Sequence, residues 1–226
     1  MKKIPTLFER EYENHKVVGI TDKLTNPAFQ DILDHPAKYR WTTKFDGTCC
    51  CVMNGIVYKR YDAKRGKKAP EGAIPCCDPD PVTGHHPHWV VVHDGDPGDK
   101  YIVEAFKNSA TSFEVNEAGI IRVDLEDFTY EAVGPKIQGN PYGMAPDAQH
   151  IAIRHGEDIF IEFPDRSKTR LADIRYFLQR APIEGTVIWD PIKNEPLCKI
   201  KRSDFGFKWP IPDIMEGELK VHKFLD

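Results

Sequence analysis

The sequence predicts an α+β fold in which antiparallel sheets are flanked by a few helices. The dipeptide Asn54-Gly55 stands between two apolar segments and is the strongest hairpin signal in the chain. From residue 101 to residue 161 short segments rich in β-branched and aromatic residues alternate with turn residues. Apolar residues recur at helical spacing in only two segments. Strands that greatly outnumber helices and do not alternate with them indicate an α+β architecture.

The same patterns predict each element in chain order. We expect strands at 16–20, 41–52, 56–61, 89–92, 101–103, 120–123, 128–133, 151–153, 159–161, 185–189 and 197–201, and helices from Pro27 to before Pro36 and over 171–178, extending to 179 or 180. The polar segment 62–100 is long for a connection, which is typical of functional loops. We find no repeat or linker and predict one domain over residues 1–226.

The composition is that of a soluble globular protein. Of 226 residues, 40% are hydrophobic and 29% charged. No apolar run approaches the ~20 residues of a membrane span, and the N-terminus lacks the apolar core of a signal peptide. We therefore expect a cytoplasmic protein with no membrane partner, and a monomer. The net charge of −4 argues against a uniformly basic surface but permits a local basic groove.

The six cysteines do not form a disulfide framework. Five of them lie in two adjacent clusters, 49–51 and 76–77, where sequence neighbours rarely reach bridging geometry. We expect reduced thiols, with Cys49 to Cys51 packing as small residues against a core. Cys76-Cys77 with the histidines at 85, 86 and 88 does not match the usual zinc spacing, so we do not predict a zinc site.

Lys44-Phe45-Asp46-Gly47 is the first candidate for chemistry. A lysine at a strand end, followed by Asp and Gly, lets a backbone come close to a phosphate. The amine attacks phosphorus only when neutral, which burial or nearby cations favour. If 41–52 is one strand of the hairpin, Lys44 and Arg60 on the return strand face one cleft. Such a motif occurs by chance in roughly 5% of chains this long, so a surface turn is the alternative.

Two further features lie near the C-terminal end. Glu184 precedes Gly185 and opens an apolar strand. Lys199 and Lys201 alternate with apolar residues, so both face the same side of one strand. Two cations there would hold a triphosphate. Each feature alone also fits an edge strand with solvated charges.

In this order the three features resemble motifs I, IV and V of the covalent nucleotidyltransferases, which include ATP-dependent DNA ligases, RNA ligases and capping enzymes. Glu131, within Tyr-Glu-Ala-Val-Gly, resembles motif III. Arg60 follows Lys44 by sixteen residues, where that superfamily places a phosphate-binding arginine. The resemblance implies a nucleotidyltransferase fold, an ATP-grasp-like adenylation domain.

A closer resemblance is to the 5′-3′ RNA ligase family. It rests on four segments: Lys44 to Cys50, Gly139 to Gly143, Trp209 to Asp213, and Pro79 to His85 with Trp89-Val90. This resemblance implies an ATP-dependent ligase that joins 5′-phosphate and 3′-hydroxyl RNA ends. It proceeds through lysyl-AMP and an adenylylated RNA 5′ end.

The resemblance also implies residue roles. The predicted nucleotide site comprises Lys44, Asp46, Gly47, Arg60, Glu131, Glu184, Lys199 and Lys201. Lys44 would be the nucleophile, with Asp46 orienting it. Glu131 and Glu184 would position Mg²⁺, with Mn²⁺ as an alternative ion. Lys199 and Lys201 would stabilise charge developing on the α-phosphate.

The segment 59–68 carries six cations in ten positions. We expect Lys64, Arg65, Lys67 and Lys68 to bind the polynucleotide, the alternative being a solvated turn. An aromatic ring expected to stack on adenine is missing near 149–155, where His150, His155 or an aliphatic face would serve instead, unless these histidines are simply surface residues. We expect no C-terminal OB-fold after Asp213.

Other functions stay open at this point. A DNA ligase or a capping-type nucleotidyltransferase shares the motifs, and a non-catalytic module could use the same fold to bind RNA ends. An intact lysine with both carboxylates favours an enzyme.

Overall fold

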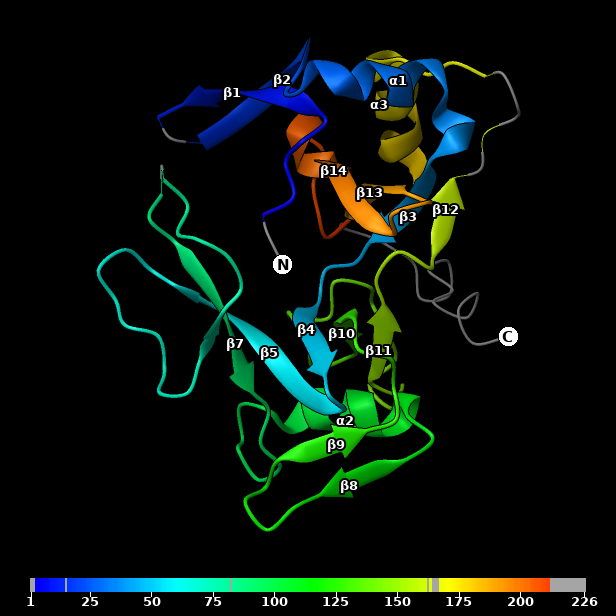
Figure 1. Ribbon diagram of the computed structural model, residues 1–226. Coiled ribbons are helices and arrows are strands. Elements are labelled where there is room, and N and C mark those ends of the chain that lie inside the picture. The colour runs from blue at the N-terminus through cyan, green and yellow to red at the C-terminus, as the bar shows by residue number, and fades with distance from the viewer. Residues whose placement is uncertain (1–2, 15, 82, 162, 164–166, 212–226) are drawn as a thin grey trace. The chain divides into compact units, whose positions relative to one another are not determined.

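A computed structural model describes residues 3–14, 16–81, 83–161, 163 and 167–211 (Figure 1). These residues divide into two compact units. The inserted unit comprises residues 46–155, and the split unit comprises 3–45 and 156–211. The chain therefore passes from one unit to the other twice, after Phe45 and after His155. The prediction of one domain over 1–226 stays a prediction.

The split unit contains two small sheets and most of the helical turns. Its elements are β1 (Phe8–Glu13), β2 (Lys16–Leu24), η1 (Pro27–Phe29), α1 (Gln30–Asp34), η2 (Pro36–Lys38), β3 (Arg40–Lys44), β12 (Ile159–Ile161), α3 (Leu171–Arg180), β13 (Gly185–Asp190), β14 (Glu195–Lys201) and η3 (Arg202–Phe205). The order β12-β3-β13-β14 makes a four-stranded antiparallel sheet from the described residues, and β1 pairs with β2.

The core of the split unit lies on one face of the four-stranded sheet. Trp41 of β3 and Ile188 of β13 are fully buried and face each other in register. Ile32 of α1 and Leu178 of α3 pack into the same cluster. The helices thus cover this face of the sheet. Because successive side chains of a strand point to opposite faces, the residues of β3 that alternate with Trp41, including Lys44, lie on the other face of the sheet.

The inserted unit is built on a larger antiparallel sheet. Its elements are β4 (Thr48–Met53), β5 (Ile56–Ala63), β6 (Ile74–Pro75), β7 (His86–Val91), α2 (Lys100–Ser109), β8 (Phe113–Val115), β9 (Ile121–Val123), β10 (Thr129–Val133) and β11 (Ile151–Arg154). The main strand order is β11-β10-β4-β5-β7-β6, with β9 pairing with β5 and β8. The predicted turn at Asn54-Gly55 joins β4 to β5, and both residues have positive φ, 53° and 73°.

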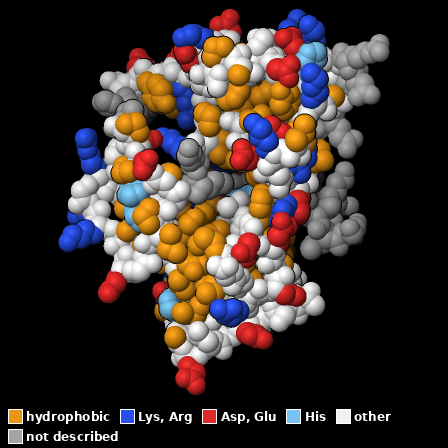
Figure 2. Space-filling model, in the orientation of Figure 1, with side chains coloured by type: hydrophobic (Ala, Val, Ile, Leu, Met, Phe, Trp, Pro, Cys, Tyr) orange, Lys and Arg blue, Asp and Glu red, His pale blue; other side chains and the backbone are white. Residues whose placement is uncertain are grey.

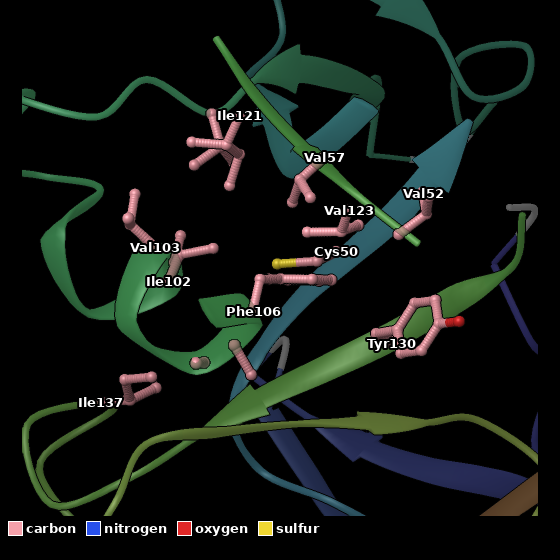
Figure 3. Packing of buried hydrophobic residues seen from close by; sticks show 13 residues of the cluster. Cys50, Val52, Val57, Ile102, Val103, Phe106, Ile121, Val123, Tyr130 and Ile137 are labelled. Atoms are coloured by element: carbon pink, nitrogen blue, oxygen red, sulfur yellow. The ribbon is translucent and has the colours of Figure 1, made fainter. Parts of the chain in front are cut away.

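The core of the inserted unit lies between this sheet and α2 (Figure 3). Phe106 of α2 is fully buried and packs edge-on against Tyr130 of β10 at 5.7 Å. Cys50 of β4 belongs to this cluster, and Cys51 packs against Tyr58 on the other face of the sheet. All six cysteines are free in the structure, and the expectation of reduced thiols stays a prediction. Burial raises the pKa of Cys51 to about 12.

Several predicted elements are confirmed. The α+β class is confirmed, as are the helix at 171, the strands at 56, 185 and 197, and the short helix after Asn26, which the structure resolves into η1 and α1. The side chain of Asn26 accepts a hydrogen bond from the amide of Ala28 and so caps that helix.

In the described part of the chain no helix combines the length and the apolar character that crossing a membrane requires.

Two predictions are wrong. Residues 101–103 are not a strand but the first turn of α2, where Ile102, Val103 and Phe106 are buried at helical spacing. The strand predicted over 41–52 is two strands, β3 and β4, which belong to different sheets and different units. Gly47 interrupts them: a Cβ there would lie 2.2 Å from the carbonyl oxygen of Ala132. Lys44 therefore does not belong to the hairpin that carries Arg60.

Candidate active site

The split unit brings three of the predicted lysines onto one face of its sheet. Lys44 and Lys201 lie on either side of Gly185 in a single cross-strand row. Lys199 lies in the next row, opposite Val187. This face is the one opposite the helix-covered core. The sequence prediction that Lys199 and Lys201 face the same side of β14 is confirmed.

Gly185 is required at the centre of this row. A Cβ at this position would lie 2.3 Å from the carbonyl oxygen of Ile200 and 2.8 Å from Cα of Lys201. Glycine therefore allows β13 and β14 to approach closely beneath the lysines. Close packing of the two strands thus explains why a glycine follows Glu184 in the sequence motif.

Glu184 holds two of these lysines. Its Oε2 accepts a hydrogen bond from Nζ of Lys44 at 2.5 Å, and its Oε1 lies 3.3 Å from Nζ of Lys201. The residue is 9% exposed, so the carboxylate has little competing water. Its backbone oxygen accepts from the amide of Arg202, which fixes the end of the strand. A charge-assisted contact of this kind fixes the position of the Lys44 amine.

The surroundings of Lys199 perturb its amine. Burial and the positive charges of Lys44 and Lys201 lower the pKa of Lys199 to about 8. The segment before β1 contributes to this burial: the amide of Leu7 donates to the carbonyl of Lys199, and the amide of Lys199 donates to the carbonyl of Pro5. The sheet face is therefore strongly cationic, which suits a polyanion.

The inserted unit holds the predicted carboxylate of motif III. Glu131 of β10 stands in register between Cys49 of β4 and Ile153 of β11. Its Oε1 accepts the amide hydrogen of Gly47 at 3.0 Å. The side chain at position 131 therefore restrains the backbone turn that follows Lys44 and Phe45 in sequence.

Tyr142 restrains the preceding amide. Its hydroxyl oxygen accepts a hydrogen bond from the backbone N–H of Asp46 at 2.5 Å. Tyr142 is buried and belongs to the loop 139–143, which Asn140 closes by bonding both the amide and the carbonyl of Met144. This loop is one of the segments that resemble the 5′-3′ RNA ligase family, but no role for Tyr142 was predicted from the sequence. The sequence feature that could have indicated Tyr142 is an aromatic residue in a short loop that also contains two glycines and a proline.

His155 contacts Glu131, the residue that binds the amide of Gly47. Its Nε2 lies 3.0 Å from Oε2 of Glu131, and its Nδ1 lies 3.0 Å from the hydroxyl of Thr129. His150 is buried, and its ring is stacked on Tyr101 at 4.8 Å. The structure therefore gives both histidines partners within the inserted unit. Neither needs a nucleotide to explain its position.

Arg60 of β5 lies on the same sheet face as Glu131. Cys50 pairs with Lys59, so Cys49 and Arg60, one residue away on each strand, share the opposite face. Nε of Arg60 donates to Asp62 at 2.9 Å. Its neighbour Lys59 is instead ion-paired with Asp99, which is 1% exposed and also accepts the amide of His93.

The predicted basic segment is divided by the structure. Lys59 and Arg60 belong to β5 and have acidic partners. The four cations predicted to bind polynucleotide follow β5 in an exposed turn, closed by the amide of Lys67 donating to the carbonyl of Lys64. Only this turn, residues 64–68, offers its charges to solvent.

The predicted site residues thus form two groups. Lys44, Glu184, Lys199 and Lys201 are together in the split unit, and Asp46, Gly47, Arg60 and Glu131 belong to the inserted unit. The Trp209 segment is described only as far as Ile211, so Pro212 and Asp213 lie outside the described residues.

The carboxylates fit an ion held mainly by phosphate and water. Across the described ranges no group of three or more His, Cys, Asp or Glu side chains is arranged to hold a metal. Glu131 and Glu184 each bind two neighbours, yet a carboxylate has about four lone-pair sites. Mg²⁺ usually takes one or two carboxylates and fills its shell with water and substrate phosphates. Each of the two carboxylates, taken in its own unit, thus has the chemical type and the free lone pairs that such an ion would need.

Comparison with known proteins gives the class of this chain. The family model for RNA ligase 1 matches residues 71–222. RNA ligase 1 of Pongo abelii is 25% identical over 263 aligned residues, which cover 91% of this chain and 78% of that protein. The Mus musculus protein of the same name is 25% identical over 264 residues, covering 91% and 77%. The Danio rerio protein is 29% identical over 92 residues, covering 40% of this chain and 28% of its own.

The chain belongs to the RNA ligase 1 family. The matched range contains Glu131, Glu184, Lys199 and Lys201, whereas Lys44 and Arg60 precede it. The alignments with the two mammalian proteins cover most of the chain. The resemblance inferred from short motifs is therefore confirmed at the level of the family.

Proposed function

We propose that this protein is an ATP-dependent RNA ligase, with a nucleotidyltransferase fold, that joins 5′-phosphate and 3′-hydroxyl ends through lysyl-AMP. One observation carries the proposal: the amine of Lys44 is held by Glu184 on a sheet face that also carries Lys199 and Lys201. A lysine fixed by a carboxylate among other cations suits attack on a phosphate. The relatives named RNA ligase 1 support the choice of reaction.

In the first step Nζ of Lys44 attacks the α-phosphorus of ATP. A nitrogen–phosphorus bond forms, the bond from the α-phosphorus to the bridging oxygen breaks, and pyrophosphate leaves. Only the neutral amine attacks, so Nζ first gives one proton to Oε2 of Glu184, already its hydrogen-bond acceptor at 2.5 Å, and it loses a second proton to solvent as the nitrogen–phosphorus bond forms. Lys199 and Lys201 offset the charge that develops on the phosphate oxygens.

The next two steps transfer AMP and seal the ends. An oxygen of the RNA 5′-phosphate attacks the phosphorus on Lys44, the nitrogen–phosphorus bond breaks, and Nζ regains a proton. The 3′-hydroxyl oxygen of the second end then attacks the activated 5′-phosphorus. A phosphodiester bond forms, AMP leaves, and the hydroxyl proton passes to solvent.

Residues of the inserted unit position the turn after Lys44. Tyr142 and Glu131 bind two consecutive amides, those of Asp46 and Gly47. A fixed backbone reduces the entropy lost when the reacting groups are aligned. Mg²⁺, with Glu131 and Glu184 as the residues that would hold it or its water shell, supplies charge compensation for the phosphates.

The proposal is tested by incubation with ATP labelled at the α-phosphate, followed by a denaturing gel. The wild type should retain one AMP on the peptide that contains Lys44, as mass spectrometry will show. Lys44→Ala and Lys44→Arg should retain none, because a guanidinium does not deprotonate in proteins. Lys193→Ala, which changes an exposed lysine of the same unit, is the matched control.

The later steps separate the competing functions. Lys44→Ala should still seal RNA supplied with a pre-adenylylated 5′ end, since this substrate bypasses lysyl-AMP. Sealing should fall sharply when the 3′-terminal ribose is replaced by deoxyribose, because proteins distinguish RNA through the 2′-hydroxyl. Equal sealing of DNA would favour a DNA ligase, and preferred labelling by GTP would favour a capping enzyme. Absence of any covalent nucleotide would leave only an RNA-end-binding module.

A further inference from the structure

Tyr61 is the exposed aromatic residue of the inserted unit. It is 39% exposed, whereas the other described Phe, Tyr and Trp side chains of this unit are buried or half-buried. Along the same face of β5, Val57 is fully buried and Lys59 is paired with Asp99. Along this strand the core cluster around α2 therefore ends before the ion pair, and the ring of Tyr61 lies beyond it.

Two imidazole rings lie beside Tyr61. His88 of β7 stands directly opposite it in register, and His86 stands opposite Ala63. The rings of His86 and His88 are 4.2 Å apart, and Nδ1 of His88 lies 2.8 Å from the carbonyl oxygen of His86. His88 is 7% exposed, and His86 is half-buried. We call Tyr61, His86 and His88 the aromatic ledge.

The ledge adjoins the exposed cationic turn. Residues 64–68 follow β5 directly, and Lys64, Arg65, Lys67 and Lys68 are all exposed. Arg65 approaches the segment before β7, because a Cβ on Gly84 would lie 2.9 Å from its Cγ. The turn is thus connected to both strands that carry the ledge. Figure 2 shows lysine or arginine side chains near histidine side chains over these loops, at the left of the inserted unit.

The acidic side chain that comes just before the turn in sequence has a partner of its own. Asp62, between Tyr61 and Ala63, is paired with Nε of Arg60. The other acidic residues of the connecting loops come after the turn in sequence, at positions 71, 78 and 80. Four cations within five positions therefore follow the strand that carries the exposed ring of Tyr61.

Aromatic rings beside clustered cations fit single-stranded nucleic acid. Cations bind the phosphates, and a ring stacks on any base that is free to leave its neighbours. The bases of a duplex are stacked on each other and do not offer their faces. We propose that the aromatic ledge stacks on a base of a single-stranded RNA end while residues 64–68 bind its phosphates. This inference rests on the proposed function and names the form of RNA that is bound.

Binding of two labelled probes, single-stranded oligouridine and a blunt RNA duplex, tests the ledge by fluorescence anisotropy. Tyr61→Leu keeps an apolar side chain but removes the ring, and it should weaken oligouridine binding about 5-fold or more. Its salt dependence should stay that of the wild type, because no charge is lost. Tyr61→Phe should bind as the wild type does. Tyr12→Leu, at a tyrosine of the split unit that is 64% exposed, is the matched control.

The cationic turn gives the complementary result. Replacing Lys64, Arg65, Lys67 and Lys68 by Ala should weaken both probes and flatten the salt dependence, because fewer counterions are released. The inference is overturned if Tyr61→Leu binds oligouridine like the wild type. It is also overturned if the duplex loses as much affinity, if Tyr61→Phe fails to bind, or if the wild type does not bind oligouridine.

Self-adenylylation keeps this test separate from the proposed function. Tyr61→Leu should capture AMP from ATP at the wild-type rate, which also shows that the variant is folded. If the wild type binds oligouridine but captures no AMP, the proposed ligase activity is refuted and the proposed stacking on the aromatic ledge is not. A variant that captures AMP and binds oligouridine normally would refute the ledge alone.

Discussion

Replacing Lys199 with methionine should stabilise the protein while abolishing AMP capture. In the folded chain, burial and the charges of Lys44 and Lys201 lower the pKa of Lys199 from 10.5 to about 8. Each unit of difference corresponds to about 1.4 kcal/mol. The shift therefore corresponds to about 3 kcal/mol of free energy by which the charged lysine disfavours folding. Methionine has similar length and removes the charge.

The pH dependence follows from the sign of this shift. The unfolded chain binds the Lys199 proton more tightly than the folded chain, so the stability of the wild type rises with pH between about 8 and 10.5. Below pH 8 the lysine is charged in both states, and the full penalty applies. The advantage of Lys199→Met should therefore be largest near pH 7 and should disappear by about pH 10.5.

Urea unfolding at several pH values measures this difference. At pH 7 Lys199→Met should unfold at a higher urea concentration, and thermal unfolding should show a gain in Tm of roughly 6 to 12 °C for a chain of this size. Lys193→Met, which removes a charge from an exposed position, should change stability little at any pH. If Lys199→Met is less stable than the wild type at pH 7, or if its advantage does not shrink as the pH rises, the reasoning about Lys199 is wrong.

Three further outcomes are expected. Asp99→Ala should lower the free energy of unfolding by about 3 kcal/mol in urea, because it leaves Lys59 without its buried partner; an unchanged midpoint would contradict this. Tyr142→Phe should slow AMP capture and lower the free energy of unfolding by about 1 to 2 kcal/mol, because the amide of Asp46 loses its acceptor. Single-turnover rates equal to those of the wild type would count against a positioning role. ATP should label the wild type more strongly than GTP or NAD, and equal labelling would remove the basis for calling the enzyme ATP-dependent.

The sequence could predict those elements whose signals are local. Asn54-Gly55 indicates a hairpin because both residues tolerate positive φ, and the structure has that hairpin. The alternation of Lys199 and Lys201 with apolar residues indicates one side of one strand, and β14 has that arrangement. In contrast, Tyr101 to Val103 has strand-like composition in a short window. Only Phe106, further along, reveals the helical period of α2.

The candidate site was predictable in its residues but not in its contacts. Chain order and residue type were enough to select Lys44, Glu184 and the two lysines of β14. The sequence did not indicate that Lys44 and Arg60 belong to different sheets: the dipeptide Asp46-Gly47 signals a turn within 41–52, but a turn alone does not show that the chain passes to another sheet. Nor did it indicate Tyr142 as a partner of Asp46, since 96 residues separate them and no periodicity links them.

The two chain crossings have a consequence for building smaller proteins from this one. In the split unit, β3 and β12 are antiparallel neighbours, and the amide of Thr43 donates to the carbonyl of Asp158 at 3.0 Å. The ends left by removing residues 46–155 are thus already arranged as the two sides of a hairpin. A short Asn-Gly turn between Phe45 and Gly156 would close it. Such a minimised chain would keep the four-stranded sheet with Lys44, Glu184 and both β14 lysines, so that these residues could be studied without the aromatic ledge and the cationic turn.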